Sequence, residues 1–242
     1  MSELSLRLEL LTSELSQRPE TAIVLTLAAY FAGLRLFGWL RSPAWCPPIL
    51  LAACLLASLL ALLPLDYTEY RHGVGWLTWL LGPATVALAV PLYQQVHHIR
   101  TLWKPIVLTL PPAAILAAGY AVGIAWLLDA PPAVLASLAP KSVTAPIAMG
   151  ITQALGGSVS LLMGALLITG VMATLSITLL ARWGNIHDQR VIGFALGVNG
   201  HAIGTVRAFD IGPTAGAFAS LGMSLTGVFT ALWLPLMWHL VG

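Results

Sequence analysis

The sequence predicts an all-α fold, a polytopic bundle of transmembrane helices in which two helices are discontinuous. The chain of 242 residues is 58% hydrophobic and only 8% charged, whereas soluble domains carry about 25% charged residues. Its apolar runs are long and continuous, which favours helices over the short alternating strands of a membrane barrel. Proline, glycine and hydroxyl residues interrupt two of these runs, a pattern typical of repeat-built transporter-like folds.

Residues 1–19 differ from the rest of the chain because they mix charged residues with leucines. They lack the basic head and apolar run of a cleavable signal peptide. We expect this segment to form a short helix at the membrane surface or a frayed terminus. Residues 20–242 then form the transmembrane domain, and its first span is its own membrane signal.

The first two spans are predicted at residues 21–40 and 48–65. Arg35 and Arg41 stand at the end of the first span and favour the cytoplasmic side. Proline at the first helical position suits the start of the second span at Pro48. The polar and aromatic segment 66–72 that follows is typical of the membrane interface.

The apolar stretch 73–95 is interrupted by Gly82-Pro83 and again by Pro91, which predicts a broken helix. The basic cluster that follows predicts a cytoplasmic loop. It contains His97 and His98, but no third ligand is near, so we expect no metal site. Residues 105–128 form the next span, with a kink at Pro111-Pro112.

The second interruption lies at the centre of the chain, where Pro140 and Pro146 enclose Lys141, Ser142 and Thr144. Each proline removes a backbone donor and clashes with the preceding turn. We expect a half-helix at 133–139, an extended linker from Pro140 to Pro146 and a second half-helix at 147–156. A charge at membrane depth is expensive and indicates a functional site. The alternative is a surface loop from which Lys141 extends to the membrane edge.

The rest of the chain contains spans at 158–180 and 216–240, with a polar loop between them that includes Arg182 and Arg190. The intervening stretch 191–210 carries four glycines. They make a poor isolated helix but a good surface for close helix packing. The four are Gly193, Gly197, Gly200 and Gly204.

The two interrupted segments contain a short internal repeat: Pro83-Ala-Thr-Val resembles Pro140-Lys-Ser-Val. A pair of interrupted segments in corresponding places indicates a transporter binding site. If both cross the membrane fully, the single span between them makes them run in the same direction, whereas crossed inverted repeats need opposite directions. Either one segment is re-entrant or the span count is off by one. The positive-inside rule favours a re-entrant second segment.

Half-helix N-termini carry unpaired N–H groups and a partial positive charge, so two of them facing one cavity attract an anion. Adding Lys141 and Arg207 predicts a carboxylate site. Hydroxyl groups at Thr85, Ser142 and Thr144 are candidates to donate to the ligand or to coordinate a cation, or else they cap helix ends.

The glycine-rich stretch supplies further polar candidates, each with a structural alternative. Arg207 and Asp210 are spaced for a local ion pair. His201 has a pKa suited to carrying a proton, although a packed, hydrogen-bonded histidine is the alternative. Asn199 caps a helix or lines the cavity. The full predicted substrate site is Lys141, Ser142, Thr144, Thr85, Pro83, Pro140, Pro146, Asn199, His201, Thr205 and Arg207.

Three stretches, 81–93, 140–149 and 200–208, resemble the LrgB/CidB family, and the likeness extends over nearly the whole chain after the first twenty residues. Val206 stands where the family is expected to have alanine, a conservative change. The resemblance implies a bacterial inner-membrane protein, antiholin-like, linked to control of murein hydrolase activity and lysis. It also implies a small holin-like partner of the LrgA/CidA type. Plastid relatives resemble glycolate/glycerate translocators, and some bacterial members are implicated in pyruvate movement.

The sequence therefore supports two alternative functions. The protein is either a transporter of small monocarboxylates such as glycolate, glycerate or pyruvate, or an antiholin-like regulator that acts through its partner. Cation coupling and a homo-oligomer are left open. An enzyme is disfavoured because no nucleophile–base pair appears, and no cofactor is expected. Cys46 and Cys54 would lie about 12 Å apart on a helix, too far for a disulfide. The net charge of +2 comes from scattered cations, which does not suggest nucleic acid.

Overall fold

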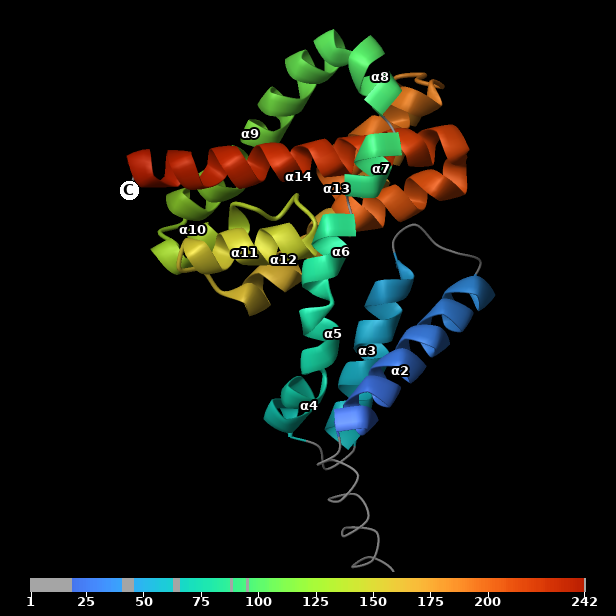
Figure 1. Cartoon of the computed structure of the whole chain (residues 1–242), viewed down its shortest axis with the longest axis vertical. Helices are drawn as coiled ribbons and strands as arrows, with labels where there is room; N and C mark the ends of the chain where they lie inside the picture. The colour runs from blue at the N-terminus through green and yellow to red at the C-terminus, as the bar shows by residue number, and fades with distance from the viewer. Residues whose placement is uncertain (1–18, 41–45, 63–65, 88, 95, 242) are drawn as a thin grey trace, which may run out of the picture. The chain divides into compact units, whose positions relative to one another are not determined.

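Figure 1 presents the computed structural model of the chain, which describes residues 19–40, 46–62, 66–87, 89–94 and 96–241. The regular elements of these residues are all helices, so the predicted all-α class is confirmed. The predicted segment 1–19 lies almost wholly outside the described residues. The helices are α2 (Pro19–Trp39), α3 (Pro48–Leu62), α4 (Tyr67–Gly73), α5 (Gly75–Trp79), α6 (Leu81–Ala87), α7 (Ala89–Gln94), α8 (Val96–Thr101), α9 (Trp103–Leu127), α10 (Pro132–Leu138), α11 (Ala145–Ala154), α12 (Val159–Trp183), α13 (Gln189–Ile211) and α14 (Pro213–Val241).

Within the described ranges, four helices are long and apolar enough to cross a membrane: α2, α9, α12 and α14. They correspond to the spans predicted at 21–40, 105–128, 158–180 and 216–240. The described part of the predicted second span is α3, with 15 residues, and the predicted end of that span at residues 63–65 lies outside the described residues. The chain is therefore a multi-pass membrane protein. The predicted repeat and discontinuous membrane helices stay predictions at this level.

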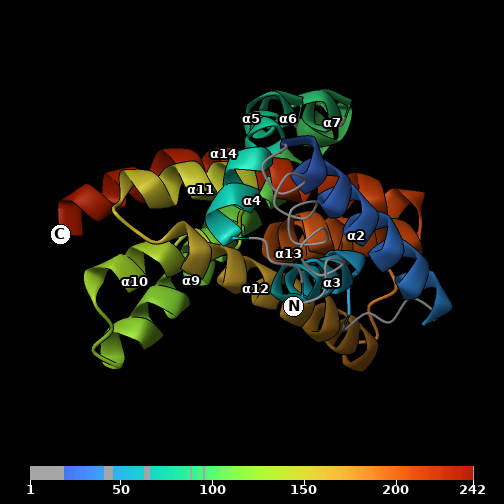
Figure 2. The ribbon, with the colours of Figure 1, turned by 90° about the horizontal axis from the view of Figure 1, so that it is seen from below.

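Contacts divide the chain into two compact units, Met1–Pro83 and Ala84–Gly242. In the first unit, α2 and α3 lie side by side (Figures 1 and 2). A Cβ on Gly33 would lie 2.8 Å from the backbone nitrogen of Ala52, so these two helices meet at their backbones. The Thr26 hydroxyl also hydrogen-bonds the Tyr70 hydroxyl at 2.9 Å, which ties α4 to α2.

In the stretch predicted to break at Gly82-Pro83, the described helices break at Val74 and again at Leu80, two residues before Gly82. Pro83 is the third residue of α6. The N–H groups of a first helical turn have no intrahelical acceptor, so a proline there removes no hydrogen bond. Pro83 is therefore compatible with the start of α6, whereas residue 88 lies outside the described residues and the break expected at Pro91 stays a prediction.

In the second unit, α13 and α14 pack backbone against backbone, as the glycine-rich stretch predicted. A Cβ on Gly193 would lie 2.1 Å from the carbonyl oxygen of Ala215, and one on Gly197 would lie 2.0 Å from that of Ala219. Only glycine permits this separation at both positions. Gly200 faces another neighbour, the Ala173 side chain of α12, at 3.4 Å.

Helix α13 reverses direction at His201, a feature that the sequence analysis did not predict. The backbone there leaves the helical region, with φ 42° and ψ −133°. A Cβ on Gly204 would lie 2.2 Å from the carbonyl oxygen of Leu196, whereas eight residues of continuous helix would separate these positions by about 12 Å. The second part of α13 therefore folds back along the first part. The pairings of Gly193 with Ala215 and Gly197 with Ala219 then make α14 run parallel to the first part of α13.

Candidate functional site

The central segment of the chain folds close to its predicted boundaries. Helix α10 ends at Leu138 and α11 begins at Ala145, and the residues between them form turns. The segment also closes on itself, because the N–H of Ser158 donates a hydrogen bond of 2.7 Å to the hydroxyl of buried Ser137. The chain from Ser137 to Ser158 is thus a loop that leaves α10 and returns to it.

The linker between α10 and α11 is buried along its length. Pro140 is among the fully buried side chains, and Lys141, Ser142 and Thr144 are 7%, 8% and 4% exposed. Turns organise its backbone: the N–H of Lys141 donates to the carbonyl of Leu138, and the N–H of Val143 donates to that of Pro140. A surface loop carrying an exposed lysine, the alternative considered from the sequence, does not describe this arrangement.

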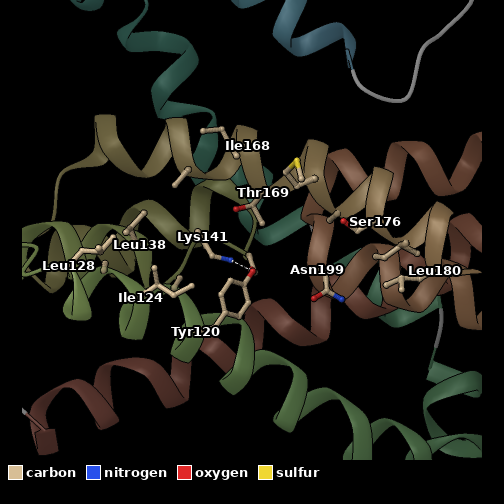
Figure 3. Close-up of a pocket in the computed structure, with 17 residues that line it drawn as sticks. Tyr120, Ile124, Leu128, Leu138, Lys141, Ile168, Thr169, Ser176, Leu180 and Asn199 are labelled. Carbon is tan, nitrogen blue, oxygen red and sulfur yellow. Dashed lines mark hydrogen bonds between the residues drawn. The ribbon is translucent and has the colours of Figure 1, made fainter.

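Lys141 is held by a tyrosine from α9. Its Nζ donates a hydrogen bond of 2.7 Å to the hydroxyl of Tyr120 and lies 4.3 Å from the centroid of that ring. A longer contact of 3.4 Å reaches the hydroxyl of Ser142. Figure 3 shows Lys141 and Tyr120 pointing toward one another. Among the described residues no carboxylate pairs with Lys141; the ion pairs there are Arg190–Asp188 and Arg207–Asp210.

A buried ammonium is costly without a compensating anion, and hydroxyl and aromatic partners offset only part of that cost. Lys141 is therefore a buried cation with unused capacity to bind a negative group.

Lys141 borders a cavity of about 660 Å³ between α9, α10, the linker, α12 and α13. Most of its walls are apolar, formed by residues such as Ile124, Leu138 and Met172. The polar groups on the walls are few, and Lys141 is the only charged one among them. They are Tyr120, Lys141, Ser142, Thr169, Ser176 and Asn199. A space with one cation and mostly apolar walls suits a small molecule with one anionic end.

Helix α11 begins at Ala145, two residues before the predicted start at 147, and its first residues do not line this cavity. Thr144 is its N-cap residue, yet the side chain makes no capping hydrogen bond. Its hydroxyl is buried without a partner among the described residues. Pro146 is the second residue of α11, a position that tolerates proline. Neither residue lines the cavity around Lys141.

The polar residues predicted on α13 separate into two groups. Asn199 lines the cavity, and its amide nitrogen donates to the carbonyl of Ala195 at 3.0 Å. His201, Thr205 and Arg207 do not line it. The ring of His201 is buried, and its Nε2 lies 3.0 Å from the carbonyl oxygen of Leu166, the packed arrangement considered as an alternative.

The side chains of Thr205 and Arg207 contact residues close to them in the sequence. The Thr205 hydroxyl donates to the carbonyl of His201 at 2.8 Å, which steadies the backbone where α13 reverses. Arg207 forms the predicted ion pair with Asp210, at 3.5 Å. These contacts account for the Thr205 hydroxyl, whereas the buried Nε of Arg207 has no hydrogen-bond partner among the described residues.

The first interrupted segment adds no residue to this site as described. Pro83 is exposed in the first unit. Thr85 lies in α6, but its side chain is outside the described residues. The predicted meeting of two half-helix ends at one cavity therefore stays a prediction.

Tyr120 is the principal residue that the sequence analysis missed, together with Thr169 and Ser176. Its signal was a lone tyrosine within an otherwise apolar span of α9. A tyrosine far from a membrane interface needs a partner for its hydroxyl, but the sequence does not say which residue that partner is.

Comparison with known proteins decides the family. The LrgB-like family model matches residues 26–240. The chain belongs to the LrgB-like family. This LrgB-like chain is 33% identical to YxaC of Bacillus subtilis, covering 89% of this chain and 93% of that protein. A Haemophilus influenzae protein is 32% identical over 79% of this chain and 83% of its own length. The antiholin-like protein LrgB of Bacillus subtilis is 27% identical over 95% of this LrgB-like chain and 99% of its own length. No solved structure matches it.

Proposed function

We propose that this protein carries small monocarboxylates, of the glycolate, glycerate and pyruvate class, across the bacterial inner membrane. The observation that carries the proposal is Lys141, a buried lysine that borders a cavity of about 660 Å³ and has no carboxylate partner among the described residues. A bound carboxylate would compensate the ammonium, so the free energy of burying this charge becomes binding free energy.

The charges on the cavity wall favour acids with a single negative group. Of the described residues that form the wall, Lys141 alone is charged. A dicarboxylate would place its second charge against apolar side chains, which costs several kcal/mol without a partner. Ser142 and Asn199 are the further polar contacts that we assign to the substrate.

The folding of the central segment supports a re-entrant element. Ser137 and Ser158 meet by a hydrogen bond, so the linker and α11 leave and return at one point. A re-entrant segment is the form that irregular backbone takes when it lines a wet cavity at membrane depth. In this proposal Pro140 keeps the linker non-helical, Pro146 lies in the first turn of α11, and the remaining predicted residues shape the protein around the linker.

The test is uptake of labelled glycolate and pyruvate into proteoliposomes. Lys141→Met keeps the length and apolar stem of the side chain but removes its charge, and we expect it to abolish uptake. The matched control is Lys104→Met, because Lys104 is the other lysine of the chain and is exposed. Equal uptake by the two variants would refute the role of Lys141, and no uptake by the wild type under any acid gradient would refute transport.

The second candidate function is regulation of murein hydrolase activity and lysis through a small holin-like partner of the LrgA/CidA type. It is favoured by the antiholin-like LrgB proteins to which the chain is similar over most of its length. Lys141→Met also separates the two functions. A regulator without a substrate site would keep its effect on lysis in this variant, whereas a regulator that acts through acid flux would lose it.

A further inference from the structure

We propose that Tyr120 is the second arm of the carboxylate site, so that its hydroxyl and the Lys141 ammonium form a fork that binds both oxygens of one carboxylate. This inference rests on the proposed function and identifies a further substrate-binding residue for it. Tyr120 comes from α9 and Lys141 from the linker, and both line the same cavity.

The spacing of the two donor atoms suits a bidentate ligand. Lys141 Nζ and Tyr120 Oη are 2.7 Å apart. Two donors held side by side on a guanidinium produce the strong, oriented pairing of arginine with carboxylates. A lysine alone is a point charge and does not impose this orientation. The tyrosine adds the second donor that the lysine lacks.

The hydrogen-bond donors and acceptors of Lys141 and Tyr120 also match. An ammonium has three donors and no acceptor, whereas a tyrosine hydroxyl both donates and accepts. Lys141 therefore donates to the Tyr120 oxygen, which leaves the tyrosine proton free. No other hydrogen bond to this hydroxyl is found within the described part of the chain. A carboxylate that enters the cavity can accept a hydrogen bond from the Tyr120 hydroxyl at one oxygen and a hydrogen bond from the Lys141 ammonium at the other.

The ring of Tyr120 has a separate role before the ligand arrives. Its centroid lies 4.3 Å from Lys141 Nζ, and the ring face attracts a cation. Tyr120 is 55% exposed, whereas Lys141 is 7% exposed. The tyrosine thus stabilises the charge in the empty site and presents the more accessible arm to the substrate.

The experiment compares Tyr120→Phe with the wild type in two assays: proteoliposome uptake, and equilibrium binding of labelled pyruvate and glycolate to the purified protein in nanodiscs. Phenylalanine keeps the ring beside Lys141 and removes only the hydroxyl. A hydrogen bond to a charged group is worth about 1.5–3 kcal/mol, which corresponds to an increase of about 10- to 100-fold in KM and Kd. The maximal uptake rate stays near the wild-type value. The matched control is Tyr93→Phe, because Tyr93 is exposed and does not line the cavity.

Two further measurements examine the fork itself. Methyl pyruvate, which lacks the charge and the second equivalent oxygen, is expected not to compete with pyruvate. Adding Tyr120→Phe to Lys141→Met is expected to weaken binding less than Tyr120→Phe does alone, because the fork is already broken.

The outcomes separate the two proposals. An unchanged or lowered KM and Kd in Tyr120→Phe overturns the fork while uptake by the wild type upholds transport. Binding without uptake in the wild type refutes transport, and the Kd values of the variants still decide the fork. A wild type that neither binds nor moves these acids overturns both.

Discussion

Replacing Gly197 by alanine should force α13 and α14 apart. The added Cβ would lie 2.0 Å from the carbonyl oxygen of Ala219, and real Cβ contacts are essentially never shorter than 3.0 Å. The two backbones must therefore separate by at least 1.0 Å. Backbone atoms cannot rotate away as a flexible side chain can, so we expect the upper part of the usual range for overpacking, about 3 kcal/mol.

The matched control is Gly164→Ala on α12. A Cβ at Gly164 meets nothing within 4 Å, so this variant only gains the helix propensity of alanine, about 1 kcal/mol. Both variants share that gain, and their difference isolates the clash. For a chain of this size, about 3 kcal/mol shifts Tm by roughly 6–12 °C.

The assay is thermal unfolding of both variants in the same nanodiscs. Gly197→Ala should melt about 6–12 °C below Gly164→Ala. It should also weaken acid binding, because Asn199 follows two residues later and lines the cavity. Equal melting temperatures in the two variants would contradict the close approach of α13 and α14.

Two other substitutions test the closed segment and the start of α13. Ser137→Ala should lower the free energy of unfolding by about 1–3 kcal/mol, because it leaves the N–H of Ser158 without its acceptor. The control Ser58→Ala, at an exposed serine, should change the free energy of unfolding by less than about 0.5 kcal/mol. Equal effects of the two variants would contradict the hydrogen bond that joins Ser158 to α10. Hydrogen bonds from Arg190 hold the pKa of Asp188 below its usual range. Asp188 therefore stabilises the folded protein above the unfolded-state pKa of about 3.9 and loses this contribution as the pH falls through the lower folded-state value. In thermal melts, the wild type should exceed Asp188→Asn at neutral pH and converge with it in acid; a constant gap down to the lowest pH would contradict this origin.

The parts of the fold that follow from local chemistry were predictable from the sequence. Continuous hydrophobic runs indicate spans because the bilayer requires about 20 apolar residues. Pro140 indicated where α10 ends, since proline disrupts a helix interior, whereas α11 begins one residue before Pro146, inside the predicted linker. The glycines at 193 and 197 indicated a close helix contact, and both face α14.

The reversal at His201 had no local signal. A positive φ ordinarily selects glycine, and Gly200 stands beside it, so the sequence favours the wrong residue for this conformation. Tertiary contacts impose it: the His201 ring is anchored at Leu166, and Gly204 permits the return of the chain. A backbone held in such a region costs about 1–3 kcal/mol, which the packing around it must offset.

The candidate site was predicted in part for a related reason. Lys141 stands out in an apolar sequence because of its charge, whereas the partner of a charge depends on which helices meet. Tyr120 lies twenty-one residues away on α9, and nothing local connects it to Lys141. Thr144 carries the same local signal as Ser142, yet only Ser142 faces the cavity.

The folding back of α13 changes how often the chain crosses the bilayer. Its first part has about twelve residues, roughly 18 Å of helix, which is less than the hydrocarbon thickness of about 30 Å. The second part returns toward the surface from which the first part entered, so α13 contributes no net crossing. Helix α14 then starts on the face where α12 stopped. We therefore predict that the end of α14 at Val241 and the polar turn at 184–188 lie on opposite sides of the membrane, which hydropathy alone does not decide.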